Sequence, residues 1–389
     1  MKRTFVSRNI QTAGPVYLDC NATAPLEPAV HETMLRWFGA EIGNAGSRTH
    51  EYGLRAKKAV QHARGQVAAV VDGAADEVLF TSGATESNNL AILGLAAFGE
   101  KSGRRHIIST AIEHKAVLEP LQALEAKGFT VTLLKPDESG AVSAAAVSDA
   151  LRPDTLLVSV MQANNETGIR QPIDEIASAL GGHEAFFHVD AAQGFGKEPD
   201  TLRSKRIDLI SVSSHKVYGP VGVGALVARR RGFNKAPLEP LLYGGGQERG
   251  LRPGTLPVPL IVGLGLAAEL ASRNHAARRA RCLEIREQAF GALEPLGIRI
   301  HGDPSKALPH VVNFSVGGID AEALMVAIKD LAAVSNGSAC TSQSYEPSHV
   351  LKAMALPDEA IAGAVRVSWS HMTPEVPWTQ ISGRIRSLL

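Results

Sequence analysis

The 389-residue sequence has few cysteines, almost no net charge and no long hydrophobic run. Its three cysteines, Cys20, Cys282 and Cys340, are odd in number, lie far apart and form no Cys-x-x-Cys pair. This spacing argues against a disulfide framework and against a zinc site built from cysteines alone. The thirteen histidines show no metal-ligand spacing such as His-Glu-x-x-His. We therefore expect no resident metal and at least one free thiol.

The low charge and the absence of long apolar runs argue against two further classes of protein. A formal net charge of +1 gives no electrostatic reason to expect direct binding to a nucleic-acid backbone. No apolar stretch approaches the roughly 20 residues that span a bilayer. The basic start Met1-Lys2-Arg3 is not followed by the apolar core of a signal peptide. We expect a cytoplasmic protein without membrane contact.

What the sequence does contain is an alternation of short apolar segments with amphipathic ones. This alternation predicts crossover connections, and hence a mainly parallel sheet covered by helices on both faces. In such α/β folds, ligands bind beyond the carboxyl ends of the strands. The expected strands are 77–81, 105–110, 130–134, 156–161, 185–189 and 209–213, and the expected helices lie near 84–98, 114–127, 144–151 and 172–180.

The C-terminal third has a different pattern. A Gly/Pro-rich stretch at 243–259 precedes a long helical pattern over 258–293, which we expect to join two domains. Strand candidates at 297–301, 310–316 and 364–369, with helices between them, indicate a smaller α+β domain. We therefore expect a large domain over 16–257, and an interdomain helix with a small domain over 258–389. The N-terminal segment 1–27 is expected to pack on the small domain.

Two residues about one strand–helix step apart suggest an aldehyde cofactor. Lys216 ends the run Ser-Ser-His-Lys after an apolar strand, and Asp190 lies in His-Val-Asp-Ala-Ala-Gln after the preceding strand. A lysine held among small residues can form a Schiff base, and a buried aspartate can keep a pyridinium nitrogen protonated. Taken alone, Lys216 could equally be a solvated charge and Asp190 a strand-end cap.

A phosphate on such a cofactor needs an anion site, and residues 81–87, Thr-Ser-Gly-Ala-Thr-Glu-Ser, lie between a strand and a helix. Small residues there would let the backbone approach closely. Free N–H groups at the helix start, the helix dipole and the Thr85 hydroxyl could bind a dianion together. Ser213 and His215 could complete this cup. The alternative is a plain Ser/Thr helix cap, with His215 in a surface loop.

Two further loops follow predicted strands. His114 comes just after the strand 105–110, where an imidazole could stack on a planar ring and move protons. Its alternative role is a helix cap. The loop 161–168 has the sequence Met-Gln-Ala-Asn-Asn-Glu-Thr-Gly, and its amides could bind the cofactor or the substrate. A simple Asn-rich turn is the competing interpretation.

Taken in order, these motifs resemble the cysteine desulfurases of the iron–sulfur-cluster assembly and nitrogen-fixation type, over roughly residues 16–370. Those enzymes depend on pyridoxal 5′-phosphate and have the class V aminotransferase fold. The resemblance implies an α/β fold of the type I transferase class, with a mainly parallel seven-stranded sheet and a smaller α+β domain. The motifs are Tyr17-Leu18-Asp19 with Asn21-Ala22-Thr23, the heptad 81–87, Glu113-His114-Lys115, Asn164-Asn165-Glu166, His188-Val189-Asp190, the run 214–220 and the run 244–250.

A thiol separates the desulfurases from their aminotransferase relatives. Residues 335–344, Ser-Asn-Gly-Ser-Ala-Cys-Thr-Ser-Gln-Ser, resemble the desulfurase active-site loop. Cys340 lies there in a polar stretch without apolar periodicity, which suits a mobile arm that carries sulfur away from the cofactor. Cys282 lies in a helical pattern and is interpreted as a packing residue. Cys20 remains ambiguous.

The resemblance also implies a role for each site residue. Lys216 would bind the cofactor covalently, Asp190 would pair with its pyridine nitrogen, and His114 would stack on the ring and assist proton transfer. Cys340 would take the sulfur of L-cysteine as a persulfide, so that L-alanine is released. The other contacts are implied as follows: Ala84, Thr85, Ser213 and His215 at the phosphate, Gln193 at the ring oxygen, Asn165 at the cofactor and the substrate, Arg366 at the substrate carboxylate, and Thr255 at the phosphate of the neighbour in a homodimer.

The acceptor of the sulfur stays open at this point. An iron–sulfur scaffold, a tRNA-thiolating enzyme and a DNA-sulfur-modifying enzyme are all compatible with the sequence, and Cys340 could share a cluster with such a partner. Two other functions are compatible as well. An aminotransferase or lyase of the same fold would not depend on Cys340, and a sulfur-carrier or docking protein would show little turnover alone.

Overall fold

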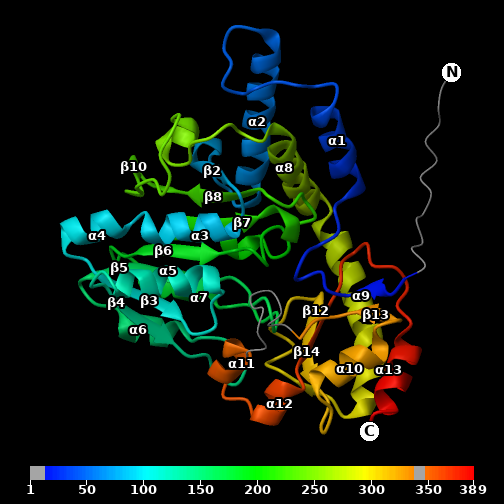
Figure 1. Ribbon diagram of the computed structural model, residues 1–389. Coiled ribbons are helices and arrows are strands. Elements are labelled where there is room, and N and C mark those ends of the chain that lie inside the picture. The colour runs from blue at the N-terminus through cyan, green and yellow to red at the C-terminus, as the bar shows by residue number, and fades with distance from the viewer. Residues whose placement is uncertain (1–13, 337–346) are drawn as a thin grey trace, which may run out of the picture.

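The computed structural model describes residues 14–336 and 347–389. In these residues seven strands form one sheet, in the order β2-β8-β7-β6-β5-β3-β4 (Figure 1). Strand β8 runs antiparallel to its neighbours β2 and β7, and the other neighbouring pairs are parallel. The bounds are β2 (Val78–Thr81), β3 (His106–Thr110), β4 (Thr130–Leu134), β5 (Thr155–Met161), β6 (Phe186–Asp190), β7 (Leu209–Ser213) and β8 (Gly224–Ala228).

The mainly parallel α/β sheet predicted from the sequence is confirmed. The strands expected at 77–81, 105–110, 130–134, 156–161, 185–189 and 209–213 are all present, with ends that differ by no more than one residue. Strand β8 was not expected. Alternate residues of the strands face different cores, since Val78 and Phe80 belong to one apolar cluster and Leu79 to another. Burial on both faces explains why these strands have few polar residues.

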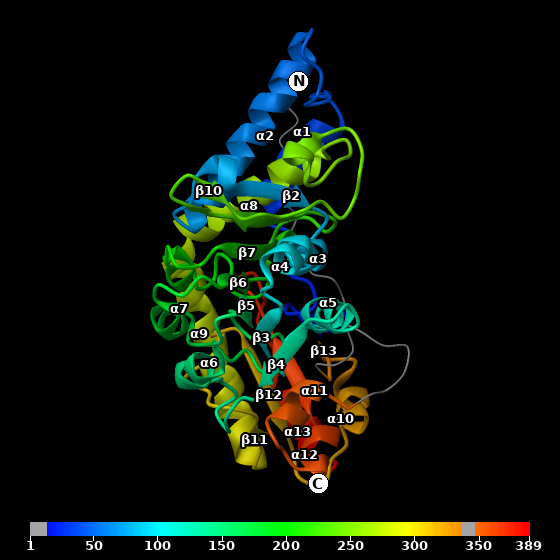
Figure 2. The ribbon, with the colours of Figure 1, turned by 90° about the vertical axis from the view of Figure 1, so that its left-hand side faces the viewer.

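Helices cover both faces of the sheet (Figure 2). Helices α3 (Ala84–Leu93), α4 (Ala96–Ser102) and α5 (Lys115–Glu125) lie on one side, and α6 (Ala144–Ala150) and α7 (Ile173–Leu180) on the other. The single helix expected at 84–98 is therefore two helices. The peptide N–H of Glu239 donates to the Gly94 carbonyl. The loop that contains Glu239 therefore satisfies this carbonyl at the break between α3 and α4.

Two helices that the sequence analysis did not identify form an arm with α8. Helices α1 (Pro28–Phe38) and α2 (Glu51–Val70) pack on α8 (Val258–Arg273) and extend away from the sheet (Figure 1). A Cβ added at Gly265 would lie 2.6 Å from the Cα of Ala63, so α2 and α8 approach closely at small residues.

The helical pattern expected over 258–293 is also two helices. Helix α8 ends at Arg273, and α9 (His275–Leu293) begins after Asn274, whose backbone leaves the helical region. The break lets each half face a different apolar cluster. Residues of α8 pack in the cluster of the large sheet, whereas Cys282 and Ile285 of α9 pack with Phe314 and Trp369.

The smaller part of the molecule has its own core. Its antiparallel sheet has the order β11-β12-β14, and β1 pairs with β13 in parallel, so the N-terminal segment joins this part. The residues of this core are distinct from those of the cluster beneath the large sheet, and the division into two domains stays a prediction. The remaining bounds are β1 (Val16–Tyr17), β9 (Arg230–Arg231), β10 (Asn234–Lys235), β11 (Arg299–Ile300), β12 (Val311–Ser315), β13 (Ala332–Ala333), β14 (Val365–Ser368), α10 (Ala321–Ile328), α11 (His349–Ala353), α12 (Asp358–Ala362) and α13 (Trp378–Arg386).

Within the described ranges, every helix is too short or too polar to cross a lipid bilayer.

Candidate active site

A cavity of about 630 Å³ lies beyond the carboxyl ends of the parallel strands. Loops after β2, β3, β5, β6 and β7 all contribute to it, as expected for a sheet of this topology. The N-terminal segment and β14 of the small part close it from the other side. Most of the predicted site residues line it, namely Ala84, Thr85, His114, Asn165, Asp190, Gln193, Ser213, His215, Lys216 and Arg366.

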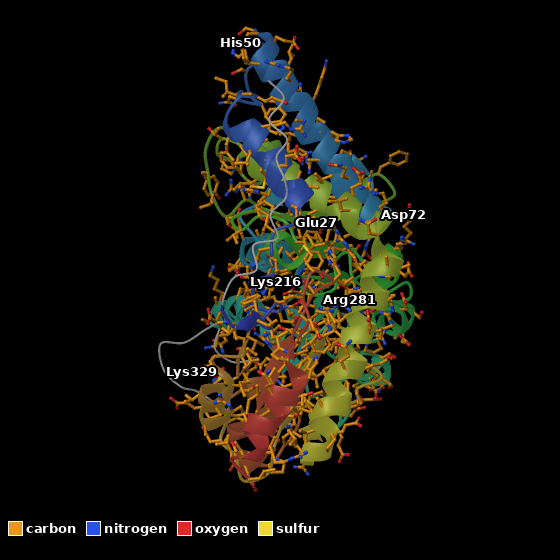
Figure 3. All side chains as sticks on the ribbon, turned by 90° about the vertical axis from the view of Figure 1, so that its right-hand side faces the viewer. Glu27, His50, Asp72, Lys216, Arg281 and Lys329 are labelled. Carbon is orange, nitrogen blue, oxygen red and sulfur yellow. The ribbon has the colours of Figure 1, made fainter. Side chains whose placement is uncertain are left out.

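Lys216 points into this cavity and is not a solvated surface charge. It ends the short 3₁₀ turn Ser214–Lys216 that follows β7. Its Nζ donates to the backbone carbonyls of Asn21 and Ala22, the latter at 2.7 Å. In Figure 3 it lies midway along the molecule. The amino group is therefore held between the sheet and the N-terminal segment, where a bound molecule can reach it.

Asp190 is held rigidly at the end of β6. Its Oδ2 accepts a hydrogen bond of 2.7 Å from Asn88 Nδ2, and its Oδ1 accepts one of 2.9 Å from the peptide N–H of Ala192. Only 5% of the residue is exposed. The sequence analysis missed Asn88. An asparagine on the buried face of a helix that covers a sheet could have indicated this contact, because a buried amide needs a hydrogen-bond partner.

The start of α3 leaves donors open to the cavity. Its N-cap is Gly83, and no side chain in the described residues caps it. The Thr81 and Ser87 hydroxyls lie 2.8 Å apart and bond each other, while Glu86 accepts from the peptide N–H of Ser82. The plain Ser/Thr cap considered for this heptad is thus not what forms, and the first N–H groups of α3 remain available for an anion.

His114 caps α5 and also lines the cavity. As the N-cap, its Nδ1 accepts from the peptide N–H of Ala116 at 3.0 Å. Burial lowers its pKa; the charge of Asp190 opposes this shift and that of Lys216 adds to it. The ring is therefore neutral at pH 7. Since Nδ1 accepts, Nε2 carries the proton.

His215 is neutral for the same physical reason. Burial lowers its pKa to about 4, and the charges of Lys216 and Lys197 act in the same direction. Its Nδ1 lies 3.2 Å from the Thr23 hydroxyl, so the ring is oriented by the N-terminal segment and not free in a surface loop.

Arg366 brings a cation from the small part into the cavity. Its side chain is fully buried, and its guanidinium forms an ion pair of 2.6 Å with Asp19. The same group donates to the backbone carbonyl of Asn165 at 2.9 Å. Its Nε has no partner among the residues that the structure describes. Asp19, which the sequence analysis named only as part of a motif, is therefore an additional residue of the site. Its proximity to Arg366 could not be predicted, because the two residues lie far apart in the sequence.

One predicted residue, Thr255, does not line this cavity, and a second, Cys340, is not among the residues that the structure describes. Thr255 lines a separate cavity of about 650 Å³, together with Arg48, Lys57 and Arg249. The other two thiols are buried, and burial raises the pKa of both Cys20 and Cys282 to about 11. This confirms Cys282 as a packing residue and makes Cys20 one as well.

The residues present fit a planar cofactor that carries a phosphate. Three buried amide oxygens of cavity residues, Asn21 Oδ1, Asn88 Oδ1 and Gln193 Oε1, have no hydrogen-bond partner within 14–336 and 347–389. Buried polar atoms normally have partners, so unpaired ones around a cavity indicate a missing ligand. The open helix start can bind an anion, and the fixed carboxylate of Asp190 can hold a protonated ring nitrogen.

Comparisons with known proteins agree with this geometry. A family model described as aminotransferase class V matches residues 16–375. The cysteine desulfurase IscS of Anaeromyxobacter dehalogenans is 45% identical over 363 residues, which cover 93% of this chain and 89% of that protein. The crystal structure of DndA from Streptomyces lividans has a TM-score of 0.80 and 49% identity, and the match covers 89% of this chain and 97% of that one. The structure of SspA in complex with cysteine has a TM-score of 0.80 and 37% identity, with coverage of 91% and 98%.

Proposed function

The chain belongs to the class V aminotransferase family and is a cysteine desulfurase, and we propose that it converts L-cysteine to L-alanine with pyridoxal 5′-phosphate as cofactor. One observation carries the cofactor assignment. Lys216, Asp190 and the open N-terminus of α3 surround one cavity, although they are far apart in the sequence. This is the set of groups that an amine-reactive aldehyde on a phosphorylated pyridine requires.

The cofactor would be held by residues already in place. When bound, it supplies an aldehyde that captures amines and a ring that withdraws electrons. The phosphate would bind the N–H groups of Ala84 and Thr85, with Ser213 and His215 beside it. Asp190 would keep a proton on the ring nitrogen, because its carboxylate is fixed by Asn88 and Ala192. Gln193 lies on the same cavity wall and would bond the ring oxygen.

Two further groups of the chain would act at the cofactor, one by binding it and one by donating a proton. Lys216 would bind the cofactor at rest and would be displaced by the amine of L-cysteine. His114 presents a neutral imidazole with its proton on Nε2, so it can stack on the ring and donate that proton to a leaving group nearby.

Arg366 would orient the substrate through its carboxylate. The substrate would share the guanidinium with Asp19, which already occupies one edge of it at 2.6 Å. Asn165 lies at the same place, since its carbonyl accepts from Arg366 at 2.9 Å. A compact monocarboxylate such as L-cysteine suits this shared site better than a dicarboxylate, because Asp19 repels a second negative charge.

The sulfur would leave on Cys340. The Cys340 thiol forms an S–S bond to the substrate sulfur while the substrate C–S bond breaks, and the carbon receives a proton to give L-alanine. The product on the protein is a persulfide, so atoms and electrons balance without an external oxidant. An acceptor then takes this sulfur. We include an iron–sulfur scaffold, a tRNA-thiolating enzyme and a DNA-sulfur-modifying enzyme among the candidates.

We also propose a homodimer with two composite sites. Thr255 lies away from the cavity of its own chain and beside the cations Arg48, Lys57 and Arg249, which supports a contribution to a phosphate held by a second copy. A cytoplasmic location remains a prediction from the sequence.

The cofactor assignment is tested with Lys216→Ala. The variant reconstituted with pyridoxal phosphate should lack the visible absorption band of a lysine-bound cofactor, and alanine formation from L-cysteine should fall by about 100-fold or more. Lys197→Met is the matched control, because Lys197 is also a buried lysine but does not line the cavity. A Lys216→Ala protein with normal absorbance and turnover would contradict the assignment.

A further inference from the structure

We propose that Glu166 is a positioning residue for sulfur transfer, because its buried carboxylate binds Ser348 and thereby fixes where the segment that carries Cys340 rejoins the fold. The inference rests on the proposed function, in which Cys340 must reach the substrate.

The contact between Ser348 and Glu166 has a defined direction. The Ser348 hydroxyl donates to Glu166 Oε2 at 2.5 Å, and its oxygen accepts from the peptide N–H of Leu351 at 3.1 Å. Ser348 is thus the N-cap of α11 and a donor to the large domain at the same time. The next residue, His349, lies with its Nε2 2.9 Å from the backbone carbonyl of Glu113. Ser348 and His349 are therefore attached to two different loops of the catalytic cavity.

Glu166 is itself held on several sides. Its peptide N–H donates to Asn164 Oδ1 at 2.9 Å, and its carbonyl accepts from Asn313 of β12 at 3.1 Å. Asn164 in turn donates to the backbone carbonyl of Ile112 at 3.0 Å, which joins the loops after β3 and β5. Glu166 directly follows Asn165, a cavity residue. Glu166 is therefore a fixed anchor for Ser348 beside the cavity wall.

Helix capping alone does not explain this arrangement. Ser143 caps α6 with a hydrogen bond of 3.0 Å from Ala146 and has no carboxylate partner among the described residues. Glu166 is 3% exposed, and burial raises its pKa, while the hydrogen bond from Ser348 opposes that rise. Burying a carboxyl is unfavourable unless it gains a specific partner. The partner gained here is the start of α11.

The other end of the segment is attached at the same cavity. Ser335 and Arg366 exchange backbone hydrogen bonds, from the Ser335 N–H at 3.2 Å and from the Arg366 N–H at 2.6 Å. In the sequence, Cys340 is five residues after Ser335 and eight before Ser348. An extended chain spans at most about 3.5 Å per residue, so the Cα at position 340 can lie no more than about 18 Å from the first attachment and about 28 Å from the second. Both attachments therefore limit where the thiol can go.

Two substitutions of Ser348 that are isosteric with each other separate its contact with Glu166 from its role as the N-cap of α11. Ser348→Asp keeps a good N-cap acceptor but places a second carboxyl against Glu166 in place of the hydroxyl donor, whereas Ser348→Asn keeps the acceptor and adds an amide donor. We expect Ser348→Asp to slow single-turnover persulfide formation about tenfold or more, because the thiol is misplaced. Ser348→Asn should stay within about threefold of the wild-type rate on the same reasoning. Adding Glu166→Gln to Ser348→Asp should restore the rate, since the glutamine amide can donate to the aspartate.

The experiment uses full-length enzyme with bound cofactor, and it measures L-cysteine binding from the change in cofactor absorbance separately from persulfide formation. Binding should stay within about twofold in every variant, because the cavity residues are unchanged. Ser143→Asp at α6 is the matched control and should leave both steps unchanged. Equal transfer rates in Ser348→Asp and Ser348→Asn, or a slow rate that follows weaker L-cysteine binding, would overturn the inference. A wild-type enzyme that binds L-cysteine but forms no alanine would instead contradict the proposed function, and this inference with it.

Discussion

At the scale of single residues, burial determines the protonation of the groups around the cavity. Glu113 is the clearest case. It is fully buried, and burial raises its pKa to about 8 against the opposing hydrogen bonds from Thr110 and the peptide N–H of Met161. Its Oε2 has no hydrogen-bond partner in the described part of the chain. The carboxyl beside His114 is therefore largely protonated at pH 7.

This protonation predicts a pH dependence of stability. The folded-state pKa of Glu113 lies above the unfolded one, so the folded protein binds the extra proton between about pH 4.5 and pH 8 and loses stability as the pH rises through that window. Glu113→Gln removes the titration. We expect the free energy of unfolding of the wild type to fall, relative to Glu113→Gln, on the order of 1–4 kcal/mol between pH 5 and pH 8.

Denaturant unfolding of both proteins at pH 5, 6, 7 and 8 measures this difference. Taking the difference between them cancels other titrating groups, such as Lys197. Glu125→Gln, on the exposed side of α5, serves as the control and should follow the wild type. Parallel pH profiles for the wild type and Glu113→Gln would show that Glu113 is ionised in the folded state.

The site residues that could be predicted from the sequence differ in a consistent way from those that only contacts in the folded structure identify. Lys216, Asp190 and His114 could be predicted because each follows a strand and has a side chain suited to a cofactor. Asp19 and Asn88 could not, because their roles depend on contacts with Arg366 and Asp190 across the fold. The protonation of Glu113 likewise depends on its burial. The sequence does not indicate this burial, because Glu113 has charged neighbours.

At the scale of elements, strand β8 shows why the phosphate site is built from small residues. Gly224 pairs with Thr81 of β2, next to the loop that begins α3. A Cβ at Gly224 would lie 2.6 Å from the Cα of Gly83. Contacts that short do not occur between real side chains and backbone. Position 224 must therefore be glycine for β8 to pass behind the anion site. The glycine therefore allows the open start of α3 to keep its position.

Gly224→Val should consequently damage both the fold and the anion site. We expect it to lower the free energy of unfolding by about 1–3 kcal/mol, as overpacking does, and to weaken pyridoxal phosphate binding. Thermal unfolding and a titration of the apoprotein with the cofactor measure the two effects. Gly182→Ala is the control, because an added Cβ there meets no atom within 4 Å. Unchanged cofactor affinity in a folded Gly224→Val protein would show that β8 does not support the site.

The strands predicted correctly belong to the large sheet and to the small part, since β11, β12 and β14 lie within the expected ranges 297–301, 310–316 and 364–369. Strands buried on both faces are continuous apolar runs, and the helices that cover them are amphipathic. Strand β8, Gly-Ala-Leu-Val-Ala, follows a run rich in Gly and Pro, which obscures its apolar pattern. Helix α2 contains many Lys, Arg, Gln and Ala residues and packs on α8 away from the sheet, so it gave no clear apolar stripe.

At the scale of the whole molecule, the cavity lies where two separately packed parts meet. The predicted sheet placed the loops after the strands together. Arg366 of β14 was implied only by the family resemblance, and the place of Asn21 in the cavity required the tertiary structure. The sequence pattern could not show this, because no local rule relates β14 to the loops of the large sheet. The same meeting of parts brings both attachments of the Cys340 segment to the cavity.

The central claim is that the sulfur of L-cysteine passes to Cys340 from this cavity. The most direct test is mass spectrometry of the intact enzyme and its peptides after one equivalent of L-cysteine, with alanine measured in parallel. We predict one added sulfur atom on the peptide that contains Cys340 and one alanine per sulfur, and neither product in Cys340→Ser, whose cofactor absorbance persists. Alanine formed by Cys340→Ser at the wild-type rate, or an added sulfur found on Cys20 or Cys282 instead, would contradict the account.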